Sequence, residues 1–154
     1  MNWEMIGAIG EILGAAGVIF TLAYLAVQIR QNTSALESTS SDYGYTQSNL
    51  VRLHISSSEE MTEIWMKGLS DPETLNPVQL ERFRITFASI LDVIGAQYQK
   101  KGLSMISQSS WVAAEASLNR FISSSGGKWY LNTHAEGLAP EYRKFIMGKM
   151  RDNS

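Results

Sequence analysis

An apolar stretch near the start of the chain constrains the fold more than any other feature. Residues 12–29 contain no charged side chain, and the polar residues among them are Thr21 and Gln28. At about 1.5 Å per residue, a helix of this length spans about 27 Å, close to the hydrocarbon thickness of a bilayer. We therefore expect residues 1–32 to form a membrane anchor helix and residues 33–154 to form a soluble helical domain.

Two other interpretations of the apolar stretch have to be weighed. A secretory signal peptide carries Lys or Arg before its apolar run, whereas Glu4 and Glu11 precede this one and no basic residue does. No small-x-small cleavage site with an obvious mature start follows Val27. These features favour a retained anchor. The remaining alternative is a core helix buried inside its own domain, although the stretch is long and apolar for a domain of this size.

The distribution of charge predicts an orientation and excludes some partners. Arg30 directly follows the apolar stretch, so the positive-inside rule places the C-terminal domain in the cytoplasm and the N-terminus outside. The net charge is −2 and the 13 Lys and Arg residues are scattered, so we expect no nucleic-acid partner. The chain has no cysteine, which excludes disulfides, thiol nucleophiles and Cys-ligated metal sites.

Four glycines recur along one face of the predicted anchor helix. Gly7, Gly10, Gly14 and Gly17 are spaced three, four and three residues apart. On a membrane helix, small residues at such spacing allow a second backbone to approach closely. Glycine is also simply common in membrane helices, which is the alternative explanation. Four glycines on one stripe favour an interface with another helix, either from a second copy or from a different membrane subunit.

Two polar residues of this segment, Glu11 and Gln28, are candidates for an intramembrane polar site. A carboxylate deep in hydrocarbon is energetically expensive, and so is a functional candidate by default. If the span begins at Ile12, however, Glu11 lies at the membrane interface and costs little. A ring of Glu11 side chains with Gln28 at the other end of the glycine stripe would line a narrow pore in an oligomer.

The rest of the chain reads as helices with no competing strand pattern, so the predicted fold class is all-α. The first helix either continues past Asn32 into the soluble domain or breaks near residues 32–34 and restarts, and we prefer one long helix, bent or straight. A capping box is expected at Ser57 and Glu60, with a short helix after it. Asn76 can cap a long amphipathic helix that runs from Pro77 to about residue 101. Its apolar face is formed by Leu80, Phe83, Phe87, Ile90, Leu91, Ile94 and Tyr98.

Further helices are expected beyond Ser107 and from Pro140. The segment Ser123–Gly127 is predicted to interrupt them because it consists of Ser and Gly, and a short helix is expected to hold Trp129 and Tyr130. The inward-facing residues of the flanking helices are expected to be Trp111, Ala114, Leu118, Phe121 and Ile122, then Tyr142, Phe145, Ile146 and Met150.

No pattern of residues predicts catalysis or metal binding. His54 and His134 lie far apart in the sequence, and His134 with Glu136 is a spacing often met by chance. There is no P-loop, no strand-led dinucleotide-binding glycine motif and no nucleophile elbow. We therefore expect a protein that is not an enzyme, with no catalytic residue, cofactor, metal or small-molecule substrate.

The sequences of several segments resemble those of a widespread family of small bacterial uncharacterised proteins with one N-terminal transmembrane helix. The segments are W-E-M-I-G-A-I-G-E-I-L-G-A-A-G-V at 3–18, Y-L-A-V-Q-I-R-Q-N-T at 24–33, G-L-S-D-P-E at 68–73, G-G-K-W-Y at 126–130 and A-P-E-Y-R-K-F at 139–145. The resemblance implies a bacterial source and an inner-membrane location. It brings no activity, cofactor or site residue.

These observations together predict a non-enzymatic, single-pass membrane protein. It would form a homo-oligomer through its glycine-striped helix and present a cytoplasmic helical domain, with the lipid bilayer and a second membrane helix as its partners. Two alternatives stay open. The first is an ion-conducting oligomer lined by the N-terminal helix, and the second is an accessory subunit of a larger membrane complex.

Overall fold

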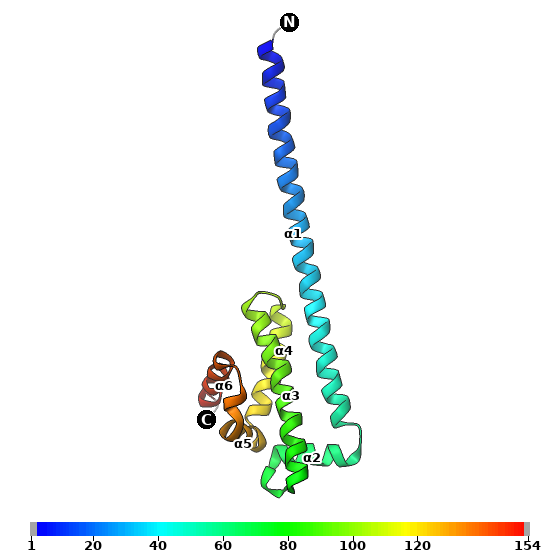
Figure 1. Ribbon diagram of the computed structural model, residues 1–154, viewed down its shortest axis with the longest axis vertical. Helices are drawn as coiled ribbons and strands as arrows, with labels where there is room; N and C mark the ends of the chain where they lie inside the picture. Colours follow the sequence, from blue (N-terminus) through cyan, green and yellow to red (C-terminus); the bar gives the residue numbers. More distant parts are fainter. Residues whose placement is uncertain (1–2, 153–154) are drawn as a thin grey trace. The chain divides into compact units, whose positions relative to one another are not determined.

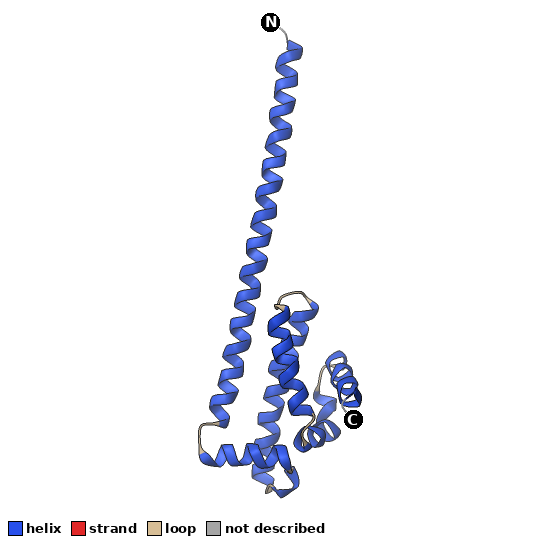
Figure 2. Cartoon of the chain, turned by 180° about the vertical axis from the view of Figure 1, so that it is seen from behind, coloured by secondary structure: helices blue, strands red, loops and turns tan. Residues whose placement is uncertain are grey.

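The computed structural model describes residues 3–152, and these are almost entirely helical (Figure 2). The predicted all-α class is confirmed, since no strand occurs in this part of the chain. The α-helices are α1 (Trp3–Ile55), α2 (Glu59–Ser70), α3 (Pro77–Gly102), α4 (Gln108–Ile122), α5 (Ser125–His134) and α6 (Pro140–Asp152). Two short 3-10 turns, Pro72–Thr74 and Ala135–Gly137, follow α2 and α5.

The chain divides into two compact units, Met1–Ser38 and Thr39–Ser154. The helix α1 belongs to both, because it runs without interruption to Ile55 (Figure 1). The expected continuation of the first helix past Asn32 is therefore confirmed. No proline interrupts α1, and its Ser- and Thr-rich middle remains helical.

The first unit contains the apolar part of α1 and the mostly polar residues that follow it, up to Ser38. The candidate span in this helix reaches a mean hydropathy of 2.1 in its most apolar window, and none of that window is buried against other parts of the described chain. The alternative of a core helix buried in its own domain is therefore wrong. By length and composition the helix is apolar enough to cross a membrane.

The core of the second unit forms around α3. The apolar face expected for this helix is confirmed: Phe83, Phe87 and Leu91 are fully buried, and Leu80 and Tyr98 pack against them partly exposed. The other helices contribute buried side chains to the same cluster, among them Ile64, Leu118, Ile122, Leu131, Tyr142 and Ile146. The inward-facing residues predicted for α4 and α6 thus lie in the core or pack against it.

The start of α2 differs from the prediction by one residue. The N-cap is Ser58, whose hydroxyl accepts a hydrogen bond from the Met61 amide at 3.2 Å. The expected cap, Ser57, instead donates its hydroxyl to the His54 carbonyl oxygen at 2.7 Å, at the end of α1. The predicted capping box between Ser57 and Glu60 is therefore wrong. Two neighbouring serines offer equivalent caps in sequence, and the preceding helix takes one of them.

The start of α3 is as predicted. The Asn76 side chain accepts hydrogen bonds from the amides of Val78 and Gln79, both at 3.0 Å. The Gln79 side chain in turn accepts one from the Asn76 amide at 3.1 Å, which completes a capping box. Pro77 occupies the first turn, where its missing amide hydrogen leaves no hydrogen bond unmade.

The prediction that Gly126 and Gly127 interrupt the helical structure is wrong, because both residues lie inside α5. A Cβ atom at Gly126 would collide with the Gly68 carbonyl oxygen of α2, and one at Gly127 would collide with the Phe121 carbonyl oxygen of α4. These glycines are therefore needed for close contact between backbones and not for a turn. The break itself is short, and Ser124 caps α5 through the Gly127 amide at 2.9 Å.

The last helix closes the core. On α6, Phe145 stacks on Tyr98 of α3 with ring centroids 4.8 Å apart. Lys149 forms an ion pair of 2.6 Å with Glu115 of α4, and this hydrogen bond holds the pKa of the Glu115 carboxyl below its ordinary value. The inward position predicted for Trp111 is also confirmed, since this residue is fully buried.

Candidate functional site

The four glycines predicted to form a helix interface lie on α1 with open space beside them. A Cβ atom placed on Gly7, Gly10, Gly14 or Gly17 would meet no atom of the described chain within 4 Å. They therefore differ from Gly68, Gly126 and Gly127, which are required by contacts inside the second unit. Nothing within residues 3–152 explains the glycine face through packing.

The two polar candidates on this helix have different surroundings. Glu11 is exposed. The Gln28 amide donates a hydrogen bond to the Tyr24 hydroxyl, one turn earlier, at 3.2 Å. The Thr21 hydroxyl likewise donates to the Gly17 carbonyl oxygen at 2.8 Å. Thr21 and Gln28 thus each form one hydrogen bond within their own helix. The structure does not bring Glu11 and Gln28 together.

The histidines form no site. His134 stacks on Tyr130, with ring centroids 5.3 Å apart, and shares a hydrogen bond of 2.6 Å with the Thr133 hydroxyl. His54 is exposed near the end of α1. Across residues 3–152, no group of three or more His, Asp or Glu side chains is placed to hold a metal ion.

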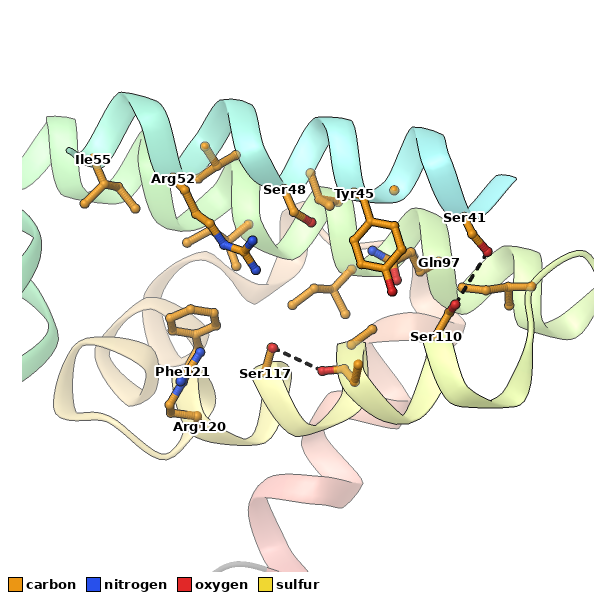
Figure 3. A pocket seen from close by; sticks show the side chains of 18 of the residues that line it. Ser41, Tyr45, Ser48, Arg52, Ile55, Gln97, Ser110, Ser117, Arg120 and Phe121 are labelled. Atoms are coloured by element: carbon orange, nitrogen blue, oxygen red, sulfur yellow. Dashed lines mark hydrogen bonds between the residues drawn. The ribbon is translucent and has the colours of Figure 1, made fainter. Parts of the chain in front are cut away.

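A cavity that the sequence did not predict lies inside the second unit. It has a volume of about 610 Å³ and is bounded by the last part of α1, by α2, α3 and α4 (Figure 3). This volume lies within the range of roughly 300–1,000 Å³ that is usual for small-molecule sites. Its walls are mostly apolar. Examples are Val51, Trp65, Ile90, Ile94 and Phe121.

The part of α1 that lines the cavity contacts the bundle at two separated places. At one, the Lys100 ammonium of α3 donates to the Ser40 carbonyl oxygen at 3.4 Å and lies over the Tyr43 ring at 4.8 Å. At the other, Val51 and Ile55 pack against the apolar core. The turns between these places present Gly44, Tyr45 and Ser48 to the cavity.

Small residues face each other across this gap. Gly44 and Ser48 of α1 lie on one wall, and Ala113 and Ser117 of α4 lie on the other. Their four-residue spacing places each pair on one helix face. This is the signal that sequence analysis could have used: two small-residue faces, both within the second unit, that cannot fill the space between them.

The cavity also has polar lining, which includes two arginines, a buried hydroxyl, and the side chains of Ser41, Tyr45, Ser48, Gln97, Ser110, Ser117 and Ser124. Arg52 of α1 and Arg120 of α4 both line it and are both exposed. No Asp or Glu is among the residues that line it. Ser40 is only 7% exposed, and in the described structure its hydroxyl has no hydrogen-bond partner. The cavity therefore combines an apolar interior with positive charge and an unpaired polar group.

The chain was compared with protein-family models, with curated proteins and with solved structures, and no match was found in any of the three comparisons.

Proposed function

We propose that the protein is a non-enzymatic, single-pass membrane protein that self-associates through the glycine face of α1 and presents the second unit in the cytoplasm of a bacterium. The observation that carries this proposal is the open space beside Gly7, Gly10, Gly14 and Gly17. Each glycine inside a helix costs about 0.5–1 kcal/mol relative to alanine. A second helix packed on this face would make use of the space and offset that cost.

The polar groups on the same face are compatible with helix packing. Thr21 and Gln28 continue the glycine spacing, and both form hydrogen bonds within α1. Each residue can keep this bond when a partner helix packs on the face.

Self-association is tested by disulfide cross-linking, for which the cysteine-free chain offers a clean background. Thr21→Cys places a thiol on the glycine face. The matched control, Ala23→Cys, places one at nearly the same depth on the opposite side of the helix. In full-length protein in phospholipid nanodiscs or native membranes, we expect Thr21→Cys to form disulfide-linked dimers and Ala23→Cys to remain largely monomeric.

A second pair of variants tests the glycine face itself. Gly14→Leu, added to the Thr21→Cys chain, should abolish cross-linking because a large side chain separates the helices. Ala16→Leu, which lies outside the glycine stripe, should leave it unchanged. Equal cross-linking at the two cysteines, or indifference to Gly14→Leu, would contradict self-association through this face.

An accessory subunit of a larger membrane complex uses the same face, but with a different partner. Mild solubilisation of native membranes, followed by mass spectrometry of co-purifying proteins, distinguishes the two. A stoichiometric partner whose co-purification is lost in Gly14→Leu, together with absent self-cross-linking, would replace the homo-oligomer by the accessory subunit.

A further inference from the structure

The cavity of the second unit has the size of a ligand site. Its lining differs from one part to another, with apolar side chains along the walls and two arginines towards one end. Most of its lining surface is apolar and includes Ile90, Ile94 and Ile106, while Tyr45, Ser48 and Gln97 add polar groups. The apolar part of the wall gives a water molecule few hydrogen-bond partners, so this part of the volume is better filled by a hydrocarbon chain than by water. The cavity therefore favours an occupant that is largely apolar.

The charged residues define the other part of the occupant. Arg52 has one hydrogen bond within the described chain, from its Nη1 to Asn49 Oδ1 at 3.2 Å, and the Arg120 guanidinium lies over the Phe121 ring at 5.2 Å. Neither arginine has an ion pair with a carboxylate in the described residues, and both keep donors free. Arginine donors pair best with a carboxylate or phosphate group.

The two arginines come from opposite walls of the cavity. Arg52 lies on α1 and Arg120 on α4, and Figure 3 shows them towards the end of the cavity where Ile55 and Phe121 lie. Both side chains are exposed, so they mark an opening to solvent. An anionic group held there would remain hydrated on one side while its hydrocarbon chain entered the apolar interior.

Inside the cavity, Ser40 provides a third recognisable feature. Its hydroxyl is more than nine-tenths buried and has no partner among residues 3–152. An unpaired buried hydroxyl is destabilising, and a water molecule held beside the ligand would relieve that cost.

We propose that this cavity binds a single-chain anionic lipid of the fatty-acid type, with its carboxylate at Arg52 and Arg120 and its hydrocarbon chain between α1, α3 and α4. The complementarity of charge is the deciding argument, because a neutral apolar molecule would leave both arginines unused. This proposal does not depend on the glycine face of α1.

The test uses the full-length protein in nanodiscs of zwitterionic phosphatidylcholine, with a photoactivatable diazirine fatty acid as the probe. After irradiation, labelled peptides are identified by mass spectrometry. We expect label on the segments 90–97 and 113–121, which line the cavity. Unlabelled oleate should compete with it, whereas oleyl alcohol, which has the same chain and no charge, should compete poorly.

Charge variants distinguish binding in the cavity from partition into the bilayer. Arg52→Gln and Arg120→Gln should each raise the oleate concentration needed for half-maximal competition by roughly tenfold, as expected for loss of a charge-assisted contact. Arg151→Gln is the matched control, because Arg151 is exposed on α6 and does not line the cavity. It should leave competition unchanged.

A filling variant tests the cavity without relying on the arginines. Ser48→Leu places a larger apolar side chain in the empty volume, and should reduce labelling while the thermal midpoint stays the same or rises. A fall in the midpoint would show that no free space exists there and would overturn the proposal. Label confined to residues 3–38, equal competition by acid and alcohol, or arginine variants that match Arg151→Gln would overturn it too.

An anionic phospholipid that reaches the same arginines from the bilayer is distinguished by composition. If phosphatidylglycerol in the nanodisc abolishes labelling at concentrations where oleate does not compete, the occupant is a membrane phospholipid and the fatty-acid assignment is wrong. If labelling persists in phosphatidylglycerol and remains sensitive to oleate, the assignment stands.

Discussion

At Gly68 and Gly126 the backbones of α2 and α5 approach until no side chain fits between them. A Cβ atom at Gly68 would collide with the Phe83 ring, and one at Gly126 would collide with both that ring and the Gly68 carbonyl oxygen. In contrast, Gly148 on α6 has open space around its Cβ position. Glycines of identical chemistry thus have opposite tolerance for substitution, and only the tertiary contacts distinguish them.

We expect Gly126→Ala to lower the free energy of unfolding by about 1–3 kcal/mol, the usual cost of forcing extra volume into a packed site. Gly148→Ala, the matched control, should be neutral or stabilise by up to about 1 kcal/mol, because alanine favours helix more than glycine does. Urea unfolding of the full-length protein in detergent, followed by tryptophan fluorescence, measures both. Similar effects at the two positions would contradict the close approach of α2 and α5.

Sequence patterns at the level of single residues were informative where the signal was local. The Asn76–Gln79 capping box and the apolar face of α3 follow from neighbouring residues and were predicted correctly. The function of Gly126 was predicted incorrectly, because it depends on Gly68, which is distant in sequence. A contact between residues that are distant in sequence produces no pattern among neighbouring residues.

The helices are the most predictable part of the fold, because the spacing of apolar residues and the capping residues define each one. The chain between α1 and α2 is the exception, because Ser57 and Ser58 are equally suitable caps in sequence. The structure assigns Ser58 to α2 through the Met61 amide and Ser57 to the end of α1 through the His54 carbonyl oxygen. These two roles make different predictions for substitution.

Ser58→Ala removes an N-cap and should lower the free energy of unfolding by about 1 kcal/mol. Ser57→Ala removes a hydrogen bond to an exposed carbonyl that water can replace, so we expect a change within about 0.5 kcal/mol. Chemical denaturation of both variants under one set of conditions compares them directly. A larger loss for Ser57→Ala would reverse the assignment of the cap.

The candidate cavity was not predictable from any single helix. Periodicity identifies which face of a helix turns inward, but not whether the side chains on two facing helices fill the space between them. Gly44 and Ser48 look like a weak stretch of α1, and Ala113 and Ser117 look like part of an ordinary core face. Their meaning appears only when α1 and α4 lie opposite each other.

For the whole molecule, the division at residues 38 and 39 has a direct consequence for stability. All buried core residues belong to the second unit, between Met61 and Ile146. We therefore expect residues 39–154, produced alone, to fold as a monomeric helical domain in buffer without detergent. A cooperative thermal transition by near-UV circular dichroism, together with a monomer in sedimentation velocity, would agree with this.

A shorter chain provides the control for that experiment. Residues 58–154 lack the end of α1, including Val51 and Ile55, which pack against the core. This chain should be less stable than residues 39–154, because the exposed core surface is no longer covered. Equal stability of the two chains would mean that the end of α1 contributes nothing to the second unit.

The meeting of Gly68 and Gly126 also restricts how this sequence can change over time. A side chain at Gly126 would overlap the Gly68 carbonyl oxygen of α2, and no substitution at Gly68 can make room, because the overlap is with backbone and Gly68 is already the smallest residue. A side chain at Gly68 would instead overlap the Phe83 ring of α3. Compensation for a change at Gly126 would need α2 and α5 to separate, which moves Phe83 and the core around it. Lineages that keep this fold should therefore keep Gly126, even where the rest of the sequence has diverged.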